Sequence, residues 1–112
     1  MRGERERLID ILEAIDRIEK YAYQGKSAFE NDELIQTWMV YNFTLIGEAC
    51  RAISTDFQAQ HSGIPWADIV AMRNLLIHHY FGIDTDAIWF VVERDIPELK
   101  INIQAILHTL DQ

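Results

Sequence analysis

The sequence has 112 residues, which is enough for one domain spanning residues 1–112 with a real core but leaves little surface for a second module. A hydrophobic share of 49% excludes an intrinsically disordered chain. The net charge of -8 disfavours a protein whose whole surface neutralises nucleic-acid phosphates, and it leaves room only for a local basic pocket.

The N-terminus and the cysteine content bear on the compartment. Residues 1–7 alternate charged side chains and lead into a periodic segment, unlike the apolar run of a signal peptide or a membrane span. Cys50 is the only cysteine and stands among apolar residues, so we expect a reduced, packed thiol. These features predict a cytoplasmic protein without a membrane partner.

Two amphipathic helices are predicted in the first half of the chain. Apolar residues recur at helical spacing over residues 8–22. A polar connection follows over residues 27–32, where Asn31 or Asp32 can cap the next helix. The second helix should cover residues 33–53, and its apolar face is wide enough to predict contacts on two sides.

Gly47 and Glu48 lie inside this second helix. A glycine within a helix costs roughly 1 kcal/mol relative to alanine, so we expect another backbone to approach Gly47 closely. Glu48 has two interpretations: an exposed ion pair with Arg51 three residues later, or a functional role facing Arg73.

A loop-like polar segment, residues 54–65, precedes the third helix. Pro65 fits a helix first turn, the apolar pattern continues to Tyr80, and Gly82 is placed to stop the helix. The stretch from Arg73 to Tyr80 therefore falls at the C-terminal end of that helix.

Two more helices complete the predicted fold. Residues 84–86 offer a cap and an acidic first turn for a fourth helix. Pro97 should break or kink the path, and the capping-box spacing of Asp95 and Glu98 predicts a new helix there. Apolar residues recur at helical spacing throughout, and the sequence has no sustained alternation of apolar and polar residues, the pattern typical of strands. The predicted fold class is therefore all-α, a bundle of four or five helices.

The octapeptide at residues 73–80 concentrates groups that can bind phosphate or move protons: Arg73, Asn74, His78, His79 and Tyr80. At about 100° per residue, a regular helix aims Arg73 and Tyr80 one way and Asn74 and His78 another. The groups converge only if the helix loosens before Gly82, or if two copies of the chain share a cleft. Helix stability alone is the alternative reason for these residue types.

Other chemistries find no support in the sequence. Adjacent His78 and His79 point apart and make a poor metal pair, and no cysteine or carboxylate stands at a zinc spacing, so we expect no metal and no cofactor. The five glycines are scattered and cannot form a phosphate-cradling loop. No serine or cysteine nucleophile stands beside an evident base.

The spacing Arg73, four residues, His78, one residue, Tyr80 resembles the R-x4-H-x-Y motif of HEPN-domain toxins of the HepT type, and Asn74 matches the residue usual after that arginine. The similarity extends to the segments 46–49, 65–66, 83–84 and 96–99. It implies an HEPN-like helical homodimer in which two motifs meet in a cleft.

The resemblance further implies an enzyme: a metal-independent endoribonuclease, the toxin of a type VII-like toxin-antitoxin system. His78 would be the acid or base, Arg73 would hold the phosphate, and Asn74 and Glu48 would support them. The resemblance also implies a nucleotidyltransferase antitoxin of the MntA type that transfers AMP to Tyr80. The alternative function is a non-catalytic HEPN subunit that presents Tyr80 to such a partner.

Overall fold

The computed structural model of the protein describes residues 3–77 and 84–112, and the side chains of residues 73–77 are outside the description. Its elements are α1 (Glu4–Ala22), α2 (Lys26–Glu30), α3 (Glu33–Ala52), α4 (Thr55–Gln60), α5 (Trp66–Ile77), α6 (Thr85–Phe90), the π-helical turn η1 (Val91–Asp95) and α7 (Ile96–Leu110). The described residues contain no strand, and the all-α prediction is confirmed.

The predicted first helix is confirmed as α1, which buries one side. Five residues at three- and four-residue spacing are buried, namely Leu8, Ile11, Ala14, Ile15 and Ile18. After the helix the chain turns at Gly25, whose φ of 94° suits glycine because a Cβ is strained in this region.

The connection predicted as irregular over residues 27–32 is in fact largely helical. A short helix, α2, occupies most of it and buries Phe29, whose ring stacks against Trp89 with centroids 5.4 Å apart. The packing of Phe29 against Trp89 therefore stabilises a short helix, which the polar composition of the segment did not predict.

The long second helix is confirmed as α3, with Asp32 as its cap. The Asp32 carboxylate accepts from the backbone N–H groups of Leu34 and Ile35 at 2.9 and 3.4 Å. The buried side of α3 is apolar except for Asn42, which is fully buried; its Nδ2 donates to the Trp38 carbonyl at 2.9 Å.

The segment at 54–65 also differs from the loop that was predicted, because it contains α4. Ser54 caps this helix by accepting from Phe57 N–H at 3.2 Å. Gln58 then donates through Nε2 to the carbonyls of Cys50 and Ile53, at 3.0 and 3.2 Å. These bonds tie α4 to the C-terminal end of α3.

At Pro97 the predicted new helix is confirmed, because α7 begins at Ile96, whereas the predicted capping box is wrong. Asp84 caps α6 as expected, accepting from Ala87 N–H at 3.1 Å. The chain then runs through η1 directly into α7, and Asp95 has helical backbone angles and makes no side-chain cap bond. Pro97 sits in the first turn of α7, where a missing N–H is tolerated.

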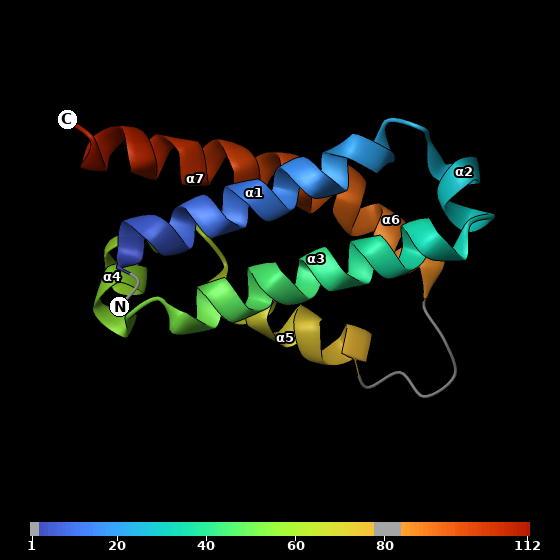
Figure 1. Ribbon diagram of the computed structural model, residues 1–112. Helices are drawn as coiled ribbons and strands as arrows, with labels where there is room; N and C mark the ends of the chain where they lie inside the picture. Colours follow the sequence, from blue (N-terminus) through green and yellow to red (C-terminus); the bar gives the residue numbers. More distant parts are fainter. Residues whose placement is uncertain (1–2, 78–83) are drawn as a thin grey trace.

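Figure 1 shows how the longer helices are arranged, in the order α7, α1, α3 and α5 from one edge of the bundle to the other. Helix α1 packs against both α7 and α3, whereas α5 packs mainly against α3. Buried apolar residues from all of these helices form one core. Within the described ranges no helix combines the length and apolar character that crossing a bilayer requires.

Candidate functional site

Helix α5 leads to the predicted site, and its N-terminal end is held by packing and a hydrogen bond. Trp66 is buried, and its indole Nε1–H donates to the carbonyl of His61 at 3.0 Å. Ile64 and Ile69 are buried on either side of it. Because α4 is bonded to the end of α3, these contacts fix where α5 begins along α3.

One predicted catalytic residue, Arg73, lies in the last described turns of α5, and the other, His78, follows these turns in the sequence. Arg73 and Asn74 belong to this helix, but their side chains are outside the described structure. His78 and Tyr80, like His79, lie outside the described residues. The convergence of Arg73 and His78 therefore stays a prediction, as does the role of Tyr80.

Glu48 and Gly47 are on α3, the helix against which α5 packs. Gly47 is buried and Glu48 is exposed, so the helix turns its glycine inward and the carboxylate toward solvent. The burial of Gly47 is compatible with a close backbone approach, which stays a prediction. Both interpretations of Glu48, as a partner of Arg51 or of Arg73, also stay predictions.

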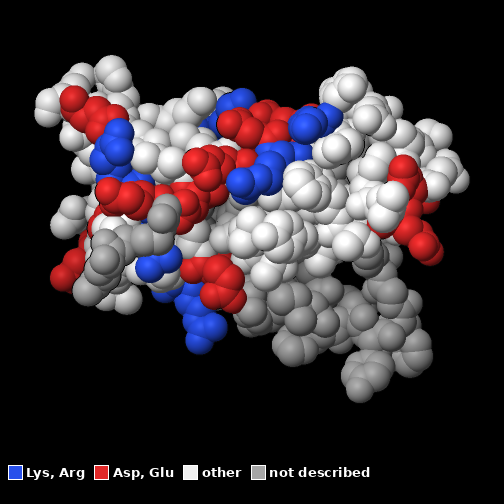
Figure 2. Space-filling model, in the orientation of Figure 1, with Lys and Arg blue, Asp and Glu red and all other residues white. Residues whose placement is uncertain are grey.

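The basic groups do not form a continuous patch on the face drawn in Figure 2; red and blue side chains alternate along α1, and the surface over the middle of α3 is uncharged. Several basic side chains are engaged with carboxylates. Arg5 lies 2.7 Å from Asp111, and Lys100 lies 2.8 Å from Glu19.

These ion pairs shift pKa values of their members in the direction that favours the charged forms. The hydrogen bond and charge of Asp111 raise the pKa of Arg5, and the same hydrogen bond lowers the pKa of Asp111. Glu19 raises the pKa of Lys100 in the same way. These two cations are therefore committed to intramolecular partners and are poor candidates for binding phosphate.

Two further features bear on the chemistry. Burial raises the pKa of the Cys50 thiol to about 12, so the thiol stays protonated near neutral pH and packs as a small apolar group, as predicted. In the part of the chain that the structure describes, no three histidine, cysteine or acidic side chains come together in a group able to hold a metal ion.

Comparison with known proteins decides the family. The model of the family described as "Ribonuclease HepT-like" matches residues 11–106, a range that includes Glu48 and the stretch from Arg73 to Tyr80. The chain belongs to the HepT-like ribonuclease family. The HEPN resemblance seen in the sequence is thereby confirmed at the level of the family.

Named relatives agree with this assignment. A protein of Thermococcus cleftensis named as a probable ribonuclease HepT is 39% identical over 102 residues, covering 88% of this HepT-like chain and 91% of the relative. A Methanocaldococcus jannaschii protein named as a candidate RNase is 34% identical over 100 residues, covering 88% of this chain and 92% of its own length. No solved structure matched the chain.

One feature of this HepT-like chain was not predicted from its sequence. Asp68 on α5 and two carboxylates near the start of α7, Asp95 and Glu98, line a common groove. Asp68 stands almost thirty positions before the other two, and no sequence pattern connects it with them, so only the folded structure reveals the group.

Proposed function

We propose that this HepT-like protein is a metal-independent endoribonuclease and the toxin of a toxin-antitoxin pair. The observation that carries the proposal is the family match over residues 11–106, within which Arg73, His78 and Tyr80 keep the R-x4-H-x-Y spacing. The site would lie at the C-terminal end of the described part of α5, since Ile77 is the last described residue of this helix and His78 follows it in the sequence.

The proposed reaction uses the RNA itself as the nucleophile. The 2′-hydroxyl oxygen attacks the adjacent phosphorus and the bond from phosphorus to the 5′-oxygen breaks. One product ends in a 2′,3′-cyclic phosphate, and the other begins with a 5′-hydroxyl. His78 takes the proton of the 2′-hydroxyl or supplies one to the leaving 5′-oxygen, because an imidazole exists in both protonation states near neutral pH.

Arg73 would stabilise the negative charge that builds on the phosphoryl oxygens. A guanidinium is always protonated and offers paired N–H donors that fit two phosphate oxygens at once. Asn74 would orient the phosphate or His78, with Glu48 as a further supporting group. This charge stabilisation is the task that a metal ion performs in other nucleases, so the reaction does not require one.

A homodimer would complete the site by bringing two copies of the motif into one cleft. On α5, Ala67 and Ala71 are exposed and lie one turn apart, on the side away from the buried Ile69. Small side chains at these positions would let a second α5 approach closely. This arrangement supports a two-fold contact along α5.

The partner of the toxin would be a nucleotidyltransferase antitoxin that modifies Tyr80. The phenol oxygen of Tyr80 would attack the α-phosphorus of ATP, forming a phosphodiester with AMP and releasing pyrophosphate. Because the added nucleotide is bulky and negatively charged, it would exclude the RNA phosphate by both sterics and repulsion.

The net charge of -8 favours a second candidate, a non-catalytic subunit that presents Tyr80 to the nucleotidyltransferase. Such a subunit does not need to attract an RNA backbone, which fits the excess of 18 acidic over 10 basic residues. It does not account for the presence of both Arg73 and His78, so we rank it second.

The decisive experiment is induced expression of the wild type beside His78→Ala, Tyr80→Phe and the control His108→Ala, with growth and cellular RNA integrity measured and folding checked by circular dichroism. His108 is exposed on α7, so its replacement makes the same chemical change away from the motif. We expect growth arrest and RNA fragments with the wild type and His108→Ala, and neither with folded His78→Ala. Tyr80→Phe should stay toxic when the antitoxin is co-expressed.

A wild type that is harmless and leaves RNA intact, with Tyr80 shown by mass spectrometry to be unmodified, would exclude the ribonuclease and select the partner-subunit function. Fragmentation that persists in folded His78→Ala would refute the assignment of the acid or base.

A further inference from the structure

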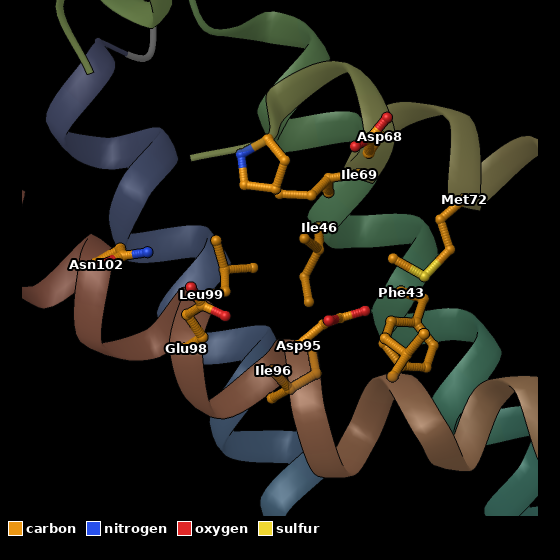
Figure 3. A pocket seen from close by; sticks show the side chains of 12 residues that line it. Phe43, Ile46, Asp68, Ile69, Met72, Asp95, Ile96, Glu98, Leu99 and Asn102 are labelled. Atoms are coloured by element: carbon orange, nitrogen blue, oxygen red, sulfur yellow. The ribbon is translucent and has the colours of Figure 1, made fainter. Parts of the chain in front are cut away.

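A groove with a volume of about 340 Å³ opens between α3, α5 and the path from η1 into α7. Its floor is apolar: in Figure 3, Phe43 and Ile46 from α3 lie near Ile69 and Met72 from α5 and face Leu99 from α7. Ile46, Ile69 and Leu99 are almost buried, so the groove reaches down to the core of the bundle.

Three carboxylates surround this apolar floor, namely Asp68, Asp95 and Glu98. All three residues are exposed, and within the described part of the chain none of them has a hydrogen-bond or ion-pair partner. The basic residues next to Asp95 and Glu98 in the sequence have other contacts: Arg94 stacks 5.3 Å from the Phe90 ring, and Lys100 is paired with Glu19. Among the described side chains, therefore, no cation neutralises the negative charge of the rim.

The π turn η1 contributes to the groove through both of its ends, Val91 and Asp95. The N–H that follows the turn, on Ile96, donates to the carbonyl of Val91 five residues back, as in a π-helix. Short π-helical turns are rare and occur frequently at functional sites. This backbone feature, which is an observation other than charge, marks the same surface.

We propose that the groove is a docking site for a helical segment of another protein, with apolar side chains that enter the groove and Lys or Arg side chains beside them. The apolar floor suits aliphatic anchors at helical spacing. The rim suits cations, because Lys and Arg lay apolar stems along a hydrophobic surface while their charged ends reach carboxylates.

Charge complementarity selects this occupant over two others. A nucleic-acid backbone is repelled by the three carboxylates of the rim. A second copy of this chain brings a net charge of -8 of its own, and the small-residue face proposed for dimer contact, Ala67 and Ala71, points away from the groove. The proposal does not depend on ribonuclease activity, because it is argued from the apolar floor and three carboxylates, none of which belongs to the R-x4-H-x-Y motif.

The test uses the full chain and a synthetic helical peptide with Leu at helical spacing and Lys at the flanking positions. A counterpart with Glu in place of every Lys, and a scrambled peptide, serve as controls. NMR titration should shift the resonances of Ile69, Met72 and Leu99 with the Lys peptide alone. The triple variant Asp68→Asn, Asp95→Asn, Glu98→Gln should bind that peptide about tenfold more weakly.

A matched variant separates specific docking from attraction to an acidic protein. Glu13→Gln, Glu33→Gln and Asp56→Asn change the net charge by the same amount at exposed positions outside the groove. This variant should bind within about twofold of the wild type. Neutralisation at Asp95 removes no helix cap, because its side chain makes no cap bond, so both triple variants should fold.

Several results would overturn the proposal: no binding of the Lys peptide, equal binding of the Glu or scrambled peptide, equal losses in both triple variants, or shifts confined to another surface. Groove resonances that move with protein concentration alone, together with a dimer by sedimentation, would assign the groove to a second copy instead. Shifts in the groove on adding an RNA oligonucleotide would assign it to RNA and likewise refute the proposal.

Discussion

Replacement of Asn42 by leucine should make this protein more stable, although it removes a hydrogen bond. Asn42 is fully buried on α3; its Nδ2 donates to the Trp38 carbonyl at 2.9 Å, and its Oδ1 has no partner among the described residues. Leucine has the same number of side-chain heavy atoms and the same branching position, so it needs little extra room.

The size of the effect follows from the two polar atoms. Loss of the Nδ2 bond costs about 1 kcal/mol, while the Trp38 carbonyl retains its ordinary partner within the helix. Removal of the unpaired, desolvated Oδ1 recovers roughly 1–3 kcal/mol. The balance is a stabilisation of about 1 kcal/mol. With an unfolding entropy of roughly 2.1 cal/mol/K per residue, it corresponds to a rise in Tm of about 4 °C.

Calorimetry and urea denaturation of wild type, Asn42→Leu and Asn42→Asp measure the balance directly. Asn42→Asp should be strongly destabilised near neutral pH, because burial opposes the charged form of the carboxylate. If folded Asn42→Leu is instead less stable than wild type by about 1 kcal/mol or more, Oδ1 has a partner such as an enclosed water molecule, and the reasoning fails.

Two further predictions concern pH and capping. Burial raises the folded-state pKa of Cys50 to about 12 from an ordinary value of 9.0, so the contribution of the buried thiol to stability is complete below pH about 9 and declines by about 1.4 kcal/mol per pH unit above it. Urea denaturation between pH 8 and 11 should show that the free energy of unfolding falls more steeply for wild type than for Cys50→Ala. Equal slopes would contradict the burial argument. Asp32→Ala removes the acceptor of two backbone N–H groups at the start of α3 and should lower the free energy of unfolding by about 1 kcal/mol. Asp32→Asn keeps a side-chain oxygen as acceptor and should therefore retain most of the stability that the cap contributes. Equal losses in both variants would show that the cap contributes through charge.

The sequence predicted those features of the fold that depend on neighbouring residues. The cap bonds of Asp32 and Asp84 connect a side chain to a backbone N–H two or three positions away, so residue type and position were sufficient. The buried residues of α1 and α7 follow from apolar spacing for the same reason.

Features that depend on distant packing were missed. Helices α2 and α4 are too short for periodicity to reveal, and they depend on Phe29 meeting Trp89 and on Gln58 reaching the end of α3. At Pro97 the local capping rule failed because the π turn before it carries the helix onward, with Ile96 N–H bonded to the Val91 carbonyl. A capping box requires a non-helical Asp95, which this continuous path does not provide.

The two candidate sites also differ in whether they could be predicted from the sequence. Arg73, His78 and Tyr80 were selected by residue type and spacing, and the family match covers their positions. Their convergence would depend on a loosened helix end or on a second copy of the chain, and spacing alone decides neither. The acidic groove was not selected, because Asp68 joins Asp95 and Glu98 only after the helices pack.

The most direct test of the ribonuclease proposal is cleavage of purified RNA by the purified wild-type protein in the presence of excess EDTA, with the new ends identified by mass spectrometry. We predict undiminished cleavage that leaves 2′,3′-cyclic phosphate and 5′-hydroxyl ends, and no cleavage by folded His78→Ala or Arg73→Ala. Cleavage abolished by EDTA and restored by a divalent metal, or products that carry 5′-phosphate ends, would contradict attack by the 2′-hydroxyl and with it the roles proposed for His78 and Arg73.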